Sequence, residues 1–271
     1  MANPVLNEKR LQAASNTWAP PEPNTEYFPP VTDGPSSPFV RETMTVNGVI
    51  SATATLFVLL LASAAVGWIR TETVVLDDGT SAVGGIPMLA WAGLITGIAL
   101  TFFLMWKPHL AKFVAPAYAI AEGFFVGAIS KAYETLYDGL VIQAAGMTLA
   151  VFTVMLVLYR TGVIRVTEKF RKIVVTATIG VMVFYGVSML IRLFGGSVSF
   201  LSSPSLLGIA FSVFVAGLAA FNLALDFDFI ERGAKQGLDK NFEWYAAFGL
   251  LVTIVWLYLE LLRLLSKLRE R

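Results

Sequence analysis

The chain has 271 residues, 56% of them hydrophobic and 14% charged, and it could not cover its own surface in water, where soluble domains carry about 25% charged residues. Its net charge is +1, and its basic residues lie between apolar runs, which argues against a nucleic-acid partner. The absence of cysteine and the single histidine, His109, exclude disulfides, thiol chemistry and a multi-histidine metal site.

The first segment, residues 1–43, is rich in proline, asparagine, serine and threonine. The run from Ala19 to Pro23 holds three prolines, which block helix and strand alike. We therefore predict a disordered tail at 1–43 ahead of a membrane domain at 44–271. The tail lacks the apolar core of a cleavable signal peptide, so we expect the first helix to be retained as a signal anchor.

Seven apolar windows follow, and each is close to the about 20 residues that a membrane-spanning helix needs. The apolar runs are continuous and do not alternate, unlike the strands of a membrane barrel. The predicted fold is an all-α, polytopic membrane bundle of about seven transmembrane helices. We place these helices at 44–69, 86–106, 112–130, 138–159, 173–194, 205–229 and 243–265.

Lysines and arginines are divided unevenly between the two sides of this bundle. The N-terminal tail and the even-numbered connections hold 13, against one in each odd-numbered connection. Basic residues concentrate in cytoplasmic loops, so we expect a cytoplasmic N-terminus. If the last helix spans the membrane the count is 13 to 7, and if it is re-entrant or tucked into the bundle the count is 17 to 3, because four more basic residues end the chain. These are Arg263, Lys267, Arg269 and Arg271.

Two predicted helices carry small residues at a spacing of four, which places each row on one helix face. Small residues let a neighbouring backbone approach closely, which is the usual basis of helix contact in lipid. We therefore expect both rows to lie at tight interfaces inside the bundle. One row is Ala115, Ala119, Gly123 and Gly127, and the other is Gly208, Ser212, Ala216, Ala220 and Ala224.

Acidic residues inside apolar helices are expensive, by about 2.5 kcal/mol or more at the bilayer centre, and they persist where they face a partner, water or a passing ion. Glu122 lies mid-helix beside the first small row, so we predict that it points toward protein. It is either a functional acid or a protonated glutamate that is hydrogen-bonded between helices.

Two further acids, Asp226 and Asp228, lie at the end of the sixth predicted helix and point about 200° apart, so they cannot face the same partner. Asp226 follows Asn222 by four residues and forms a polar stripe with it, while Asp228 continues the small-residue row. Glu260, in the last helix, has Arg263 as its nearest partner at i+3. Two acids that shared a buried site would titrate as a unit, and their oxygens are the hard ligands that Ca²⁺ prefers.

The C-terminal third resembles the Bax inhibitor family. That family's usual pattern is an aspartate near the end of the sixth helix, followed by polar residues and isoleucine, and then an aromatic-Leu-acid motif in the final helix. Asp226 lies four residues before Ile230, and Glu260 follows Tyr258-Leu259, although the family more often has aspartate there. The resemblance covers about residues 44–265. It implies a pH-sensitive Ca²⁺ leak with Asp226 and Glu260 as sensor, gate and tentative Ca²⁺ ligands, and no cofactor.

Two other functions fit the same sequence. One is a membrane interaction protein that modulates a protease or a stress or cell-death complex through the tail or the basic segment 160–172. The other is a proton-coupled transporter that uses the same acids. No Gly-x-Ser-x-Gly turn, zinc motif or P-loop is present, so we do not expect an enzyme. We expect a multi-pass protein of a bacterial plasma membrane.

Overall fold

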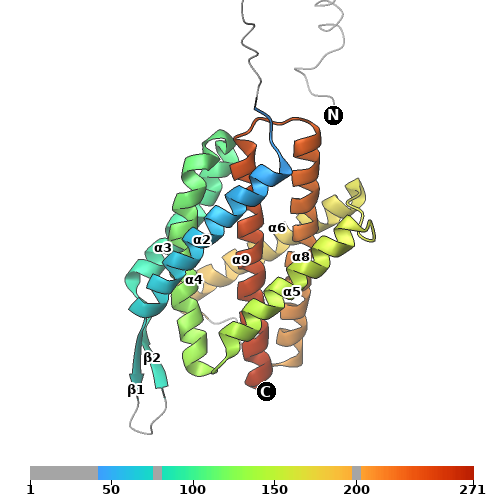
Figure 1. Cartoon of the computed structure of the whole chain (residues 1–271). Coiled ribbons are helices and arrows are strands. Elements are labelled where there is room, and N and C mark those ends of the chain that lie inside the picture. The colour runs from blue at the N-terminus through green and yellow to red at the C-terminus, as the bar shows by residue number, and fades with distance from the viewer. Residues whose placement is uncertain (1–41, 76–80, 197–202) are drawn as a thin grey trace, which may run out of the picture. The chain divides into compact units, whose positions relative to one another are not determined.

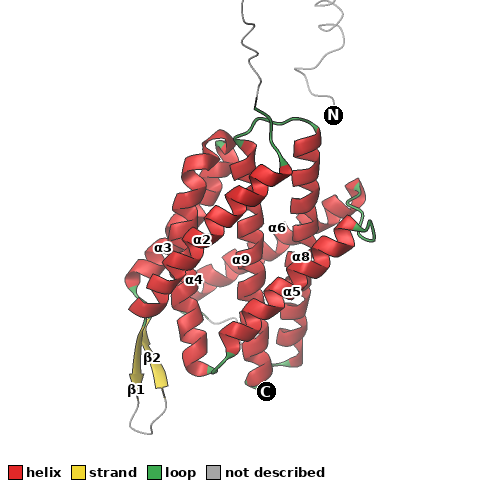
Figure 2. Cartoon of the chain, viewed as in Figure 1, coloured by secondary structure: helices red, strands yellow, loops and turns green. Residues whose placement is uncertain are grey.

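The computed structural model describes residues 42–75, 81–196 and 203–271, which belong to one compact unit of the chain, Arg41–Arg271. The predicted tail at 1–43 therefore lies almost entirely outside the described residues. Within the described residues, seven helices are long and apolar enough to cross a membrane (Figures 1 and 2). The prediction of an all-α, polytopic membrane bundle is confirmed.

The elements follow one another along the chain with short connections. A hairpin that the sequence did not predict follows the first helix, and its two antiparallel strands pair with an irregularity between Glu72 and Thr73. A single 3₁₀ turn, η1, joins the second and third helices. The elements are α2 (Val46–Arg70), β1 (Glu72–Val75), β2 (Ser81–Gly85), α3 (Met88–Trp106), η1 (Pro108–Leu110), α4 (Ala111–Leu136), α5 (Leu140–Arg160), α6 (Glu168–Leu193), α8 (Leu206–Lys235) and α9 (Phe242–Arg269).

Several helices extend beyond their apolar windows because charged residues continue them. α6 begins at Glu168, where Arg171 forms an i,i+3 ion pair with it at 3.2 Å. α8 continues to Lys235, which pairs with Glu231 one turn earlier at 2.5 Å. Such pairs stabilise a helix where it leaves the apolar phase. Hydropathy alone therefore placed the start of α6 five residues, and the end of α8 six residues, inside the observed ends.

α9 lies in the middle of the bundle and packs against α2, α4, α5 and α8 (Figure 1). It is one unbroken helix, and its last turn lies at the opposite end of the bundle from the first turn of α2. The helix makes no re-entrant turn, and it is also tucked into the bundle. Two of the four C-terminal cations, Arg263 and Lys267, bond to groups of other helices. They therefore do not count as loop charges when the lysines and arginines on the two sides of the bundle are compared.

The first small-residue row lies at the tightest helix contact, as predicted. Gly123 and Gly127 of α4 lie against the backbone carbonyls of Leu60 and Ala64 in α2, and a Cβ at either glycine would overlap them. Gly67 of α2 makes the same approach to α4. Each helix thus has a glycine where the backbone of the other helix approaches it, and this fixes the register of the pair.

The start of α2 is bonded to the start of α9. Thr45 caps α2 by accepting a hydrogen bond from the Gly48 N–H at 2.9 Å, and both its own N–H and its hydroxyl donate to Glu243 Oε1 at 2.9 Å. Thr43 forms a β-bridge with Asp239 just before α9. The Glu243 carboxylate is 6% exposed and lies at the positive end of the α2 dipole, where a negative charge is favourable.

Candidate functional site

Asp226 lies at the inner end of a pocket of about 560 Å³ between α6, α8 and α9. The pocket extends from the α8–α9 connection, where Gln236 and Leu238 line it, to Asn222 and Asp226. Asp226 lies nine residues before the end of α8, which is about 13 Å along the helix axis. A group from the aqueous side could therefore reach this carboxyl without crossing the whole bundle.

The carboxyl of Asp226 is incompletely bonded. Its Oδ2 is closed off from solvent and has no hydrogen-bond partner among the described residues. The carboxyl faces α9 at Gly249 and Thr253, and Oδ1 would lie 3.8 Å from a Cβ at Gly249. Thr253 donates its hydroxyl hydrogen to the Gly249 carbonyl at 3.1 Å. Because buried polar atoms normally have partners, an orphaned carboxyl oxygen marks a place for a proton or a ligand.

Asn222 lies one turn before Asp226 and lines the same pocket, as the predicted polar stripe requires. Its Nδ2 donates to the Thr178 hydroxyl of α6 at 2.8 Å and to the Leu218 carbonyl at 2.9 Å. Asn222 is thus satisfied by protein groups, and Asp226 is the incompletely bonded member of the stripe. The amide also ties α8 to α6 beside the carboxyl.

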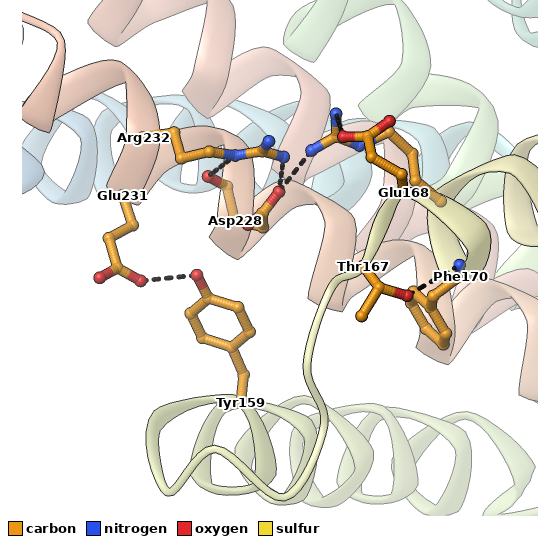
Figure 3. Close-up of polar contacts among 8 residues, drawn as sticks. Tyr159, Thr167, Glu168, Phe170, Asp228, Glu231 and Arg232 are labelled. Atoms are coloured by element: carbon orange, nitrogen blue, oxygen red, sulfur yellow. Dashed lines mark hydrogen bonds and ion pairs between the residues drawn. The ribbon is translucent and has the colours of Figure 1, made fainter.

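Asp228 lines a different hollow from Asp226 and lies in a cluster of charged side chains, which Figure 3 shows. It accepts a hydrogen bond from Arg171 of α6 at 2.8 Å and pairs with Arg232 one turn later. Its side chain is 13% exposed. The predicted divergence of the two aspartates is confirmed, and the carboxylate of Asp228 serves to join α6 to α8.

Glu260 forms a second polar site, deep in the bundle between α6 and α9. It is 2% exposed, and its Oε1 accepts hydrogen bonds from the Tyr185 hydroxyl at 2.9 Å and from Arg263 Nη1 at 3.1 Å. Arg263 Nη1 also donates to the Tyr185 oxygen at 2.7 Å. The predicted Glu260–Arg263 pair is confirmed, whereas no spacing rule pointed to Tyr185 on another helix.

The two acids that the resemblance pairs have different neighbours, and no hydrogen bond joins them among the described residues. Asp226 faces α9 at Thr253, and Glu260 lies seven residues further along that helix, about 10 Å along its axis. The long apolar start of α9 places Glu260 beyond the depth of Asp226, and Arg263 neutralises it locally. The described residues contain no group of three or more histidine, aspartate or glutamate side chains that could hold a metal ion.

Lys267 is a buried cation that the sequence analysis counted only as a tail charge. It is 2% exposed, and its Nζ donates to the Gly208 carbonyl at 3.0 Å and to the Ser212 hydroxyl at 2.9 Å. Both partners belong to the second small-residue row, which therefore lies against α9. The feature of the sequence that could have indicated this contact is the serine within the small-residue row, which can bond to a lysine near the end of the last helix.

Glu122 is 7% exposed and points toward protein, as predicted. It lies between α3 and α4, where its carboxylate contacts Gly97 and approaches Tyr118. No hydrogen bond joins it to another described residue. Because it belongs to a different interface, Glu122 does not join the groups between α6, α8 and α9.

The polar groups along α9 form a sequence with a defined order of charge. The Asp226 pocket comes first, followed by the Glu260–Arg263–Tyr185 network and then by Lys267. Arg171 and Arg232 line the Asp226 pocket as well, and Arg263, whose side chain is 34% exposed, is paired with Glu260, whereas Lys267 is 2% exposed. Along α9, the buried carboxyl of Asp226 is therefore followed by an ion pair and then by a buried cation.

Comparisons with known proteins agree with the resemblance seen in the sequence. A family model described as Bax inhibitor 1 like matches residues 3–270, which is nearly the whole chain. A search of curated proteins gave no match. With its seven candidate membrane spans, the chain is a multi-pass membrane protein that belongs to the Bax inhibitor 1 like family.

Proposed function

We propose that the protein is a proton-sensitive cation leak, selective for a hard cation such as Ca²⁺, in a bacterial plasma membrane. The observation that carries the proposal is the orphaned Oδ2 of Asp226 at the inner end of its pocket. The proposal needs no catalytic step and no cofactor. It keeps Asp226 as the sensor and assigns Glu260 to the gate.

Asp226 has two ways to satisfy its carboxyl. An ionised carboxylate without a partner is expensive in a low-dielectric place, and either a proton or a cation removes that cost. Carboxylate oxygens are ligands that Ca²⁺ prefers, and waters in the pocket could complete its coordination. Proton and cation therefore compete for the same oxygens, so the leak should rise as the pH rises.

The gate in this proposal is the network of Glu260, Arg263 and Tyr185. The charges of Arg263 and Glu260 offset each other, so Lys267, which has no ion pair among the described residues, would repel a cation that had passed Asp226. Tyr185 bonds to both members of the ion pair from α6. A movement of α6 away from α9 would break these bonds and allow the Arg263 side chain to leave the path.

The sidedness of the leak follows from the charge distribution. The pocket opens beside the α8–α9 connection, on the side that holds the majority of lysines and arginines. We propose that this side, with the N-terminus, is cytoplasmic. The proton that the protein senses would then be the cytoplasmic one.

Flux of Ca²⁺ into liposomes that contain the purified chain tests the proposal. We expect flux to increase between acidic and mildly alkaline pH, and we expect Asp226→Asn to lose this dependence. Glu122→Gln is the matched control, since it neutralises a buried acid outside the pocket and should keep the dependence. Equal pH profiles for Asp226→Asn and the unaltered chain would refute the role of Asp226.

A further inference from the structure

A second and larger hollow lies on another face of the bundle, between α2 and α5. It measures about 1170 Å³, more than the roughly 300–1,000 Å³ of usual small-molecule sites. One wall is α2 from Val46 to Val58 and the other is α5 from Phe152 to Arg160, while α8 and α9 line it with Phe227 and Leu250. We call this hollow the α2–α5 groove.

The groove is apolar along its length and charged at one end. Its walls carry exposed aliphatic side chains such as Ile50, Val58 and Leu156, which lie within membrane-spanning helices. Water has few polar partners there, so an aqueous filling is unfavourable. Arg160 and Arg165 line the groove where α5 ends and its connection to α6 begins.

The acids at the charged end already have partners. Asp228 pairs with Arg171 and Arg232, and Glu231 accepts hydrogen bonds from Tyr159 at 2.6 Å and from Lys235 at 2.5 Å (Figure 3). The cations outnumber these acids, which leaves the end of the groove positive.

The two arginines that line the groove are available. Both are exposed, and neither forms an ion pair with an acid within the described ranges. Arg160 lies near enough to Glu231 to affect it electrostatically but is not paired with it. Arg165 uses only its Nε, which donates to the Gly162 carbonyl at 3.3 Å, so its terminal nitrogens can bind an anion.

From this charge pattern we infer that the α2–α5 groove binds an anionic phospholipid, with an acyl chain against α2 and α5 and its phosphate on Arg160 and Arg165. Guanidinium groups match phosphate geometry, and basic pockets between membrane helices favour anionic headgroups. The inference is independent of the proposed leak, because none of these residues belongs to the Asp226 pocket or to the Glu260 network.

Native mass spectrometry of the full chain tests the inference. Equal amounts of phosphatidylglycerol and phosphatidylcholine with identical acyl chains are added to the detergent-purified protein, and retained lipid is counted. We expect phosphatidylglycerol to be retained about tenfold more than phosphatidylcholine, and the double variant R160Q/R165Q to lose that preference. K107Q/K112Q, which removes two exposed cations outside the groove, should keep it.

A second variant examines the apolar part of the site. Ala54 is exposed on α2 and lines the groove, so Ala54→Trp should fill it while remaining compatible with lipid. We expect this variant to retain neither lipid, with unchanged helical content. The inference would be overturned if the unaltered chain retained both lipids equally, or if R160Q/R165Q kept the preference for phosphatidylglycerol. It would also be overturned if the mass spectrum showed a dimer of the chain without bound lipid.

Discussion

Tyr185 of α6 and Arg263 of α9 are joined by a 2.7 Å hydrogen bond, and Glu260 accepts hydrogen bonds from both. The guanidinium also lies 5.1 Å from the centre of the Tyr185 ring, so it contacts that side chain twice. Each of the three groups is thus satisfied by the other two. The hydroxyl of Tyr185 ties α6 to this network.

Removing that hydroxyl should loosen α6 without disturbing the ion pair. We expect Tyr185→Phe to lower the free energy of unfolding by about 1–3 kcal/mol, because the hydrogen bond to Glu260 and the one from Arg263 are both lost. Under the proposed function, its Ca²⁺ flux should rise at every pH. Flux in liposomes and thermal unfolding in detergent are the two measurements.

Tyr258→Phe is the control for that variant. Like Tyr185→Phe, it removes one tyrosine hydroxyl, but this one belongs to α9 and lies 2.7 Å from the Ser130 hydroxyl of α4. We expect a similar loss of stability with no rise in flux. Increased flux in both variants would mean that general loosening, and not release of α6, opens the path.

Breaking the buried ion pair should cost more than removing it. Arg263→Gln leaves the buried Glu260 carboxylate without its cation, and because the Arg263 side chain is 34% exposed we expect a cost below the about 3–5 kcal/mol of a fully buried pair. The double variant E260Q/R263Q carries no charge there, so we expect it to recover part of that loss. Thermal unfolding of the two single variants and the double variant gives the coupling energy. Additive losses would show that the two side chains do not stabilise each other.

The contact between α2 and α4 predicts opposite results for two glycines. A Cβ at Gly127 overlaps the Ala64 carbonyl, whereas a Cβ at Gly146 of α5 meets no atom within 4 Å. We expect Gly127→Ala to destabilise the protein by about 1–3 kcal/mol through overpacking. Gly146→Ala should be neutral or stabilising, because alanine favours a helix more than glycine does. Equal melting temperatures for these two variants would contradict the packing described above.

The bond between Thr45 and Glu243 gives a fourth prediction. Thr45→Val removes the side-chain cap of α2 and one donor to the carboxylate, so we expect a loss of about 1–2 kcal/mol. Thr55→Val is the control, because the Thr55 hydroxyl donates only to the Ser51 carbonyl of the same helix. Hydrogen exchange of the first turn of α2 should increase in Thr45→Val alone.

The sequence was informative about features that depend on the residues of a single helix. Apolar windows placed all seven helices, and a spacing of four placed Gly123 and Gly127 on the face that meets α2. The i,i+3 spacing also identified Arg263 as the partner of Glu260. These relationships depend on helix geometry alone, so they could be derived without knowing which helices are neighbours.

The sequence was not informative about depth or about contacts between distant helices. Asp226 and Glu260 match a family pattern, but their separation depends on how α8 and α9 slide along each other. Tyr185 and Lys267 gain their roles only from the helices that they face. Counting Lys267 as a loop charge also obscured the difference in lysine and arginine content between the two sides of the bundle.

The bond between Thr45 and Glu243 joins groups 198 residues apart. During synthesis, α2 is the first of the described helices to reach the membrane, and the acid that completes its first turn is added only with the last helix. Until then that turn must be satisfied by water, by headgroups or by another protein. Closure of this end of the bundle must therefore wait for α9, whichever of the intervening helices inserted first.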